Sequence, residues 1–126
     1  RKKLNFGHTL GHAIESQAFE SGNALMHGEA IALGMLAELF LSKKLNNLSD
    51  EDYLRSTSII YKHFSDIVLD QQDLDAVLEF VKYDKKNNGE ATQFVLISAI
   101  GTAEVDVEIG VPDMREALAY LGTLSE

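Results

Sequence analysis

Three of the four histidines lie within the first 27 residues, at a spacing that suits metal chemistry. His8 and His12 are four residues apart, so a helix would project both imidazoles into one space, and His27 comes near the start of a second predicted helix. At that position the helix dipole disfavours an imidazolium ion and keeps the ring neutral, as a metal ligand requires. Because the chain has no cysteine, a transition metal would depend on imidazole and carboxylate ligands. The spacing alone favours a metal site and buried core histidines about equally.

Positive charge is concentrated in two short segments of an acidic chain. The formal net charge is -9, yet six of the eleven cationic residues lie in these segments, namely Arg1, Lys2, Lys3, Lys82, Lys85 and Lys86. Such clusters either bind a small anion or are solvated surface charges. The negative net charge argues against a nucleic-acid partner, because proteins that bind nucleic acid hold its phosphates mainly with extensive clusters of Lys and Arg. The chain lacks an apolar run of the roughly 20 residues that cross a bilayer and lacks a signal-peptide layout, so we expect a cytoplasmic protein that contacts no membrane.

The apolar pattern predicts a mainly α-helical fold. Helical spacing occurs in five segments, which are Thr9 to Phe19, His27 to Leu45, Asp50 to about His63, Asp73 to Tyr83 and Pro112 to Leu121. The second segment is apolar nearly all round, which predicts a position inside a bundle. Ser49 stands three residues before Asp52 and suits the N-cap of the third helix.

A β-hairpin is predicted between the last two helices. Phe94 to Ile100 is an apolar run, and from Glu104 to Ile109 acidic and apolar residues alternate, as in paired strands. Gly101-Thr102 fits a type II′ turn, with glycine at the position of positive φ. An isolated hairpin is marginally stable, so this one must pack on the helices or on a part of the protein absent from this chain.

We therefore expect one domain over residues 1–126, a multihelical bundle with one small β-hairpin. Gly11, Gly28 and Gly34 lie in the first two predicted helices. Glycine is unfavourable inside a helix, so all three indicate close approach of a backbone or a ligand.

The histidine motifs resemble those of the dehydroquinate synthases and their sugar phosphate cyclase relatives. Residues 1–15 have the sequence RKKLNFGHTLGHAIE, and residues 27–30 have the sequence HGEA. A second block, DKK at residues 84–86 followed by Gly89 and the apolar run from Phe94, extends the resemblance over most of the chain. That family combines an N-terminal NAD-binding α/β domain with a helical C-terminal domain. This sequence resembles the helical one, so we expect the NAD-binding domain to be absent from this chain.

The resemblance implies roles for individual residues. His8 and His27 would bind Zn²⁺ or Co²⁺, with a third ligand supplied by a glutamate of the N-terminal domain. His12 would be a general acid/base rather than a third ligand. Polar groups and the phosphate of the substrate would be held by Arg1, Asn5, Lys85 and Lys86, with Lys86 favoured over Lys85 for the phosphate. Glu15 could orient an imidazole, or it could be an ordinary acid on the helix surface.

The implied reaction converts 3-deoxy-D-arabino-heptulosonate 7-phosphate to 3-dehydroquinate, a step of aromatic amino acid biosynthesis. Transient oxidation of a ring hydroxyl by NAD acidifies the neighbouring C–H, so phosphate leaves by elimination before reduction, ring opening and aldol closure. The resemblance further implies a homodimer for the full-length enzyme, and this chain alone is expected to be inactive. Two alternatives stay open: another sugar phosphate cyclase, or a helical metal-binding module without catalysis.

Overall fold

A computed structural model describes residues 6–22, 24–64, 71–88 and 93–123, with the backbone alone at 71–73 and 83–88. Five helices and one antiparallel hairpin make up these ranges, which confirms the predicted fold class. The elements are α1 (His8–Glu20), α2 (His27–Leu45), α3 (Asp50–Phe64), α4 (Gln71–Asn88), β1 (Gln93–Ala99), β2 (Thr102–Glu108) and α5 (Val111–Thr123). Among the described helices, none combines the length and the apolar character needed to cross a lipid bilayer.

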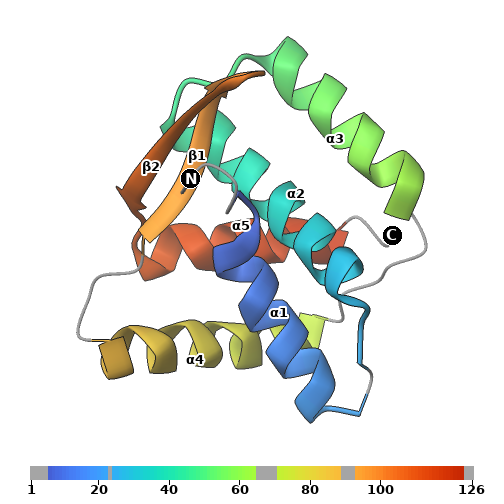
Figure 1. Ribbon diagram of the computed structural model, residues 1–126, viewed down its shortest axis with the longest axis vertical. Coiled ribbons are helices and arrows are strands. Elements are labelled where there is room, and N and C mark those ends of the chain that lie inside the picture. Colours follow the sequence, from blue (N-terminus) through green and yellow to red (C-terminus); the bar gives the residue numbers. More distant parts are fainter. Residues whose placement is uncertain (1–5, 23, 65–70, 89–92, 124–126) are drawn as a thin grey trace.

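Helix α2 is the central element, as its apolar sequence predicts. It contacts α1, α3, α5 and β1, while α4 packs against α1 and α5 (Figure 1). The main core contains buried residues of α1, α2, α4, β1 and α5, among them Leu10, Leu41, Leu78, Phe94 and Leu118. A smaller cluster of Leu39, Leu48 and Tyr53 joins α2 to α3. The hairpin is therefore stabilised by the helices of this chain.

The start of α3 agrees with the sequence expectation, and the end of α4 differs from it. Ser49 Oγ accepts the Asp52 N–H at 3.1 Å, which confirms the predicted cap of α3, but the Asp52 carboxylate accepts the N–H of Ile100 in the hairpin turn. Helix α4 continues to Asn88 instead of ending at Tyr83. No glycine or proline occurs between Tyr83 and Gly89, so the helix can continue as far as Asn88.

The hairpin turn lies one residue earlier than predicted. Ala99 pairs with Thr102, so the central residues are Ile100 and Gly101 rather than Gly101 and Thr102. Gly101 has φ 91°, which confirms the need for glycine, but positive φ at the second central position belongs to a type II turn and not to type II′. The strand after the turn begins at Thr102, two residues before the predicted alternation starts.

Candidate metal centre

Close packing of α1 on α2 brings their histidines together. A Cβ atom added at Gly34 of α2 would lie 2.0 Å from the carbonyl oxygen of Gly7 and 2.7 Å from the nitrogen of Gly11. At Gly11 of α1 an added Cβ would lie 3.2 Å from the Cα of Ile31. The expected close backbone approach is therefore confirmed at Gly11 and Gly34. It does not occur at Gly28, where an added Cβ would meet no described atom within 4 Å apart from its own stretch of helix backbone.

His8 is the first residue of α1 and lies half-buried. Its ring Nδ1 is 3.3 Å from the carbonyl oxygen of Phe6. An imidazole that donates from Nδ1 to a carbonyl has Nε2 as its unprotonated nitrogen, which is the form that binds a metal. The local backbone therefore favours one tautomer of His8.

His27 is the first residue of α2, and Glu15 orients its exposed ring. Nδ1 of His27 lies 3.1 Å from Oε1 and 3.3 Å from Oε2 of Glu15. The carboxylate accepts from Nδ1 and directs Nε2 outward, the arrangement found behind many histidine metal ligands. Glu29 stabilises the start of the same helix by accepting the Met26 N–H at 2.9 Å. Of the two readings of Glu15, the structure thus supports the one in which it orients an imidazole.

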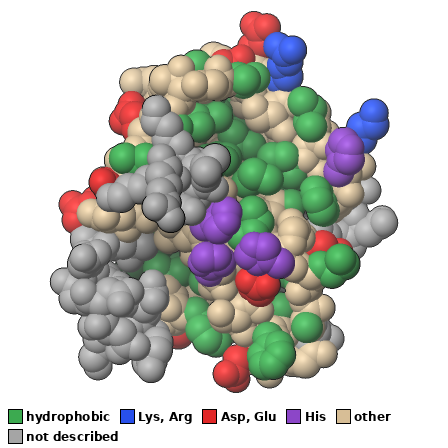
Figure 2. Space-filling view, viewed as in Figure 1, with side chains coloured by type: hydrophobic (Ala, Val, Ile, Leu, Met, Phe, Trp, Pro, Cys, Tyr) green, Lys and Arg blue, Asp and Glu red, His purple; other side chains and the backbone are tan. Residues whose placement is uncertain are grey.

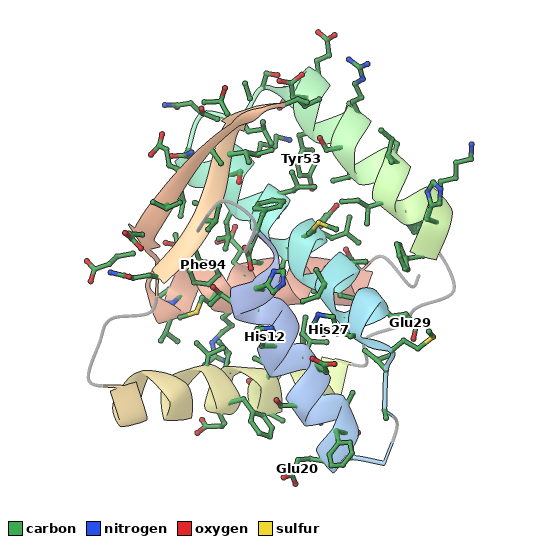
Figure 3. All side chains as sticks on the ribbon, viewed as in Figure 1. His12, Glu20, His27, Glu29, Tyr53 and Phe94 are labelled. Atoms are coloured by element: carbon green, nitrogen blue, oxygen red, sulfur yellow. The ribbon has the colours of Figure 1, made fainter. Side chains whose placement is uncertain are left out.

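The three imidazoles form one cluster on the surface. Ring centroids are 5.1 Å apart for His8 and His12, 6.1 Å for His8 and His27, and 6.0 Å for His12 and His27. Figure 2 shows histidine side chains gathered near the middle of one face, beside an acidic side chain. Figure 3 shows His12 and His27 side by side although they come from different helices.

The rings of His8 and His27 could bind one divalent ion if they moved slightly closer together. Two imidazoles that bind one tetrahedral zinc through Nε2 place their ring centroids about 5 Å apart. The observed 6.1 Å is about 1 Å wider, so the two side chains must move toward each other to share an ion. Nδ1 of each ring lies beside an oxygen that can accept its proton. The unprotonated Nε2 of each ring is therefore the nitrogen that can bind a metal. Within the ranges that the structure describes, no group of three or more His, Asp or Glu is arranged to hold a metal.

The residues expected to bind substrate are described only in part. Arg1 and Asn5 lie outside the described residues. Lys85 and Lys86 lie in the last part of α4, where the backbone alone is described. Helix α4 packs against α1, which carries two of the three clustered histidines. Lys82, the third cation of that segment, pairs with Glu79 at 3.6 Å on the surface.

Glu38 is a polar residue of this region that the sequence analysis missed. Its side chain is fully buried in α2 and accepts the backbone N–H groups of Gly7 at 2.8 Å and Leu10 at 3.3 Å. Burial raises the pKa of the Glu38 carboxyl to about 8, because desolvation outweighs the two N–H groups that favour the charged form. A sequence signal did exist: Gly34, Glu38 and Ser42 are four residues apart and interrupt an otherwise apolar helix.

Fold and geometry together define a helical domain in which three imidazoles from two helices gather at one surface. A family model described as 3-dehydroquinate synthase C-terminal matches residues 1–87. The chain belongs to this family, and the resemblance drawn from the motifs is confirmed.

Curated relatives match most of the chain, and several of them are named 3-dehydroquinate synthase. A 3-dehydroquinate synthase of Parabacteroides distasonis is 34% identical over 120 residues, which are 95% of this chain and 34% of the relative. One from Acinetobacter baumannii is 36% identical over 118 residues, 94% of this chain and 32% of the relative. A pentafunctional AROM polypeptide of Lachancea thermotolerans is 40% identical over 112 residues, 80% of this chain and 7% of that polypeptide. The chain thus spans about a third of the length of the single-function relatives.

Solved structures support the fold. The crystal structure of 2-deoxy-scyllo-inosose synthase with carbaglucose-6-phosphate, NAD⁺ and Co²⁺ matches with a TM-score of 0.74 at 23% identity. The match covers 90% of this chain and 33% of that one. A second structure of 2-deoxy-scyllo-inosose synthase matches with a TM-score of 0.70 at 22% identity, over 92% of this chain and 31% of that one. At this level of identity the likeness concerns the fold alone.

Proposed function

We propose that this chain is the metal- and substrate-binding domain of a 3-dehydroquinate synthase, which converts 3-deoxy-D-arabino-heptulosonate 7-phosphate to 3-dehydroquinate with elimination of phosphate. The observation that carries the proposal is the meeting of His8 and His27, from separate helices, with ring centroids 6.1 Å apart and both Nδ1 atoms engaged. The names of the curated relatives support the choice of reaction.

His8 and His27 hold Zn²⁺ or Co²⁺ in this proposal. When bound, such an ion supplies Lewis-acid polarisation of a substrate oxygen. Glu15 keeps the His27 ring in the orientation that presents Nε2, and the carbonyl of Phe6 does the same for His8. A catalytic zinc normally has three protein ligands, so the third comes from outside the described residues.

His12 is the proposed general acid/base. Its ring lies 5.1 Å from that of His8 and 6.0 Å from that of His27, which puts it within reach of a substrate bound at those two rings. Imidazole exchanges protons readily near neutral pH, and a positioned acid/base typically contributes about 10²- to 10⁴-fold in rate. Arg1, Asn5, Lys85 and Lys86 bind the polar groups and the phosphate through charge-assisted hydrogen bonds.

NAD is bound by a further domain in this proposal. The curated relatives are about three times as long as the matched segment, which leaves room for such a domain in them. NAD bound there would supply reversible hydride transfer, and the overall reaction would involve no net redox change and no net consumption of NAD.

The test uses the full-length protein that contains this segment. We expect phosphate release from the heptulosonate phosphate, a large loss of turnover with full metal content in His12→Ala, and loss of both in His27→Ala. His63→Ala is the matched control, because His63 is an exposed histidine of α3 whose Nδ1 contacts the carbonyl of Ile59 at 2.9 Å. Equal loss of metal in His12→Ala would make His12 a ligand. Turnover of a hexose 6-phosphate alone would assign the protein to another sugar phosphate cyclase, and no turnover of either would leave a non-catalytic metal-binding module.

A further inference from the structure

Helix α1 begins at a residue that cannot cap it. The N-cap is Gly7, which has φ 85° and no side chain, so α1 receives no local side-chain cap. The first N–H groups of a helix lack partners within the helix, and a Ser, Thr, Asp or Asn side chain at the N-cap usually binds the amide two or three residues on. A larger residue is excluded here, because a Cβ at position 7 would lie 2.4 Å from Cγ of Met35.

Glu38 supplies this cap from the neighbouring helix. Its Oε1 accepts the Gly7 N–H at 2.8 Å and its Oε2 accepts the Leu10 N–H at 3.3 Å. Leu10 is the third residue after the N-cap, whose amide a local cap would have bound. Burying a carboxyl group is costly unless its oxygens have partners, and these two amides meet that need. Among the described residues, Glu38 is the only buried acidic side chain.

The two amides held by Glu38 flank the first histidine. His8 lies between Gly7 and Leu10 in the sequence, so the backbone from which its ring projects is fixed to α2 on both sides. Helix α2 also carries His27 at its first residue. The Glu38 carboxyl thus links the backbone of one proposed ligand to the helix that bears the other.

We infer that Glu38 is a positioning residue, which holds the start of α1 so that the His8 imidazole meets His27 at the distance that a shared metal requires. The inference rests on the proposed function of these histidines, and nothing in the role requires Glu38 to touch the metal or the substrate. It explains why a buried carboxyl group is present in the most apolar helix of the fold.

Ser42, one turn further along α2, provides a matched control. It is also fully buried, its Oγ donates to the Glu38 carbonyl oxygen at 2.7 Å, and the same Oγ accepts the Ile97 N–H at 3.0 Å. Ser42 therefore ties α2 to the hairpin, and among the described residues its side chain has no hydrogen bond to the start of α1. Its loss should lower stability without displacing His8.

The experiment measures Co²⁺ affinity by visible absorption for the 126-residue chain and for Glu38→Gln, Glu38→Ala and Ser42→Ala. Glu38→Gln keeps the size and one acceptor oxygen, so it serves if Glu38→Ala does not fold. We expect at least a fivefold rise in the Kd for Co²⁺ in Glu38→Gln, with faster hydrogen exchange of the Gly7 and Leu10 amides. In Ser42→Ala the Kd should stay within twofold even if the free energy of unfolding falls. An unchanged Kd in Glu38→Gln, or an equal rise in Ser42→Ala, would overturn the inference.

Failure of the proposed function is distinguishable from failure of this inference. If the wild-type chain binds no Co²⁺ at His8 and His27, the metal proposal fails, and the Glu38 inference is then decided by two NMR readouts. Faster exchange of the Gly7 and Leu10 amides together with a shifted His8 ring resonance in Glu38→Gln supports it. Wild-type exchange and an unshifted His8 resonance refute it.

Discussion

Replacement of Gly34 by alanine tests how closely α1 and α2 must pack to bring their histidines together. The new Cβ would lie 2.0 Å from the carbonyl oxygen of Gly7, 2.7 Å from the nitrogen of Gly11 and 2.8 Å from its Cα. All three are backbone atoms, so no side chain can rotate away. To restore ordinary contact distances the helices must separate by about 1.5 Å at this point.

The expected cost follows from two opposing effects. Overpacking a core costs typically about 1–3 kcal/mol, and contacts with backbone belong at the upper end of that range. Alanine regains about 1 kcal/mol over glycine inside a helix. We therefore expect Gly34→Ala to lower the free energy of unfolding by about 2 kcal/mol. Since the added separation also moves His8 away from His27, we expect weaker Co²⁺ binding.

Gly28→Ala is the control in the same helix. Apart from its own stretch of helix backbone, an added Cβ at Gly28 meets no atom of the described residues within 4 Å, so the change should be neutral or should stabilise by up to about 1 kcal/mol. Urea unfolding followed by circular dichroism measures both variants. If Gly34→Ala were as stable as wild type and bound Co²⁺ equally well, close packing at Gly34 would not be what positions the histidines.

Three further predictions concern Glu38, Glu15 and His27. For Glu38, whose pKa is raised from 4.5 to about 8, the folded state retains a proton that the unfolded state loses, so this group makes stability fall as pH rises from about 4.5 to 8. Urea unfolding at pH 5 and pH 8 should show a steeper loss in wild type than in Glu38→Gln, by up to about 4 kcal/mol, and equal slopes would contradict the buried-acid assignment. Glu15→Gln should weaken Co²⁺ binding about tenfold by calorimetry, because the His27 ring loses its charged acceptor, and unchanged affinity would reduce Glu15 to a surface acid. Zinc binding by the 126-residue chain should be weak, with two protein ligands, and abolished in His27→Ala, whereas tight one-to-one binding that survives the change would remove His27 from the site.

The helical part of the fold could be predicted from local sequence because its signals are local. Apolar spacing places α1, α2, α3 and α5 to within a few residues, and Ser49 marks the start of α3. The end of α4 and the turn of the hairpin are set by weaker preferences. Nothing between Tyr83 and Asn88 stops a helix, and the turn type depends on which residue pairs with Ala99, a matter of register between two strands.

The candidate site also has features that the sequence predicts and features that depend on contacts between helices. Three histidines at helical spacing are visible in the sequence, and so is their family pattern. The contact of Glu15 with His27 joins residues on different helices, so the sequence leaves its role open. The partners of Glu38 cannot be read from the sequence, because they are backbone N–H groups, which any non-proline residue at those positions would present. The spacing of four between Gly34, Glu38 and Ser42 is the trace that this packing leaves in the sequence.

Nitrogen-15 NMR of the histidine rings, recorded during a zinc titration of the 126-residue chain, tests the shared metal site most directly. Nε2 of His8 and His27 should shift together and saturate at one ion per chain, while their Nδ1 atoms stay protonated and the ring of His63 serves as an unaffected reference. If the shift fell on His12 in place of His27, or on neither His8 nor His27, the two-helix metal site would be wrong.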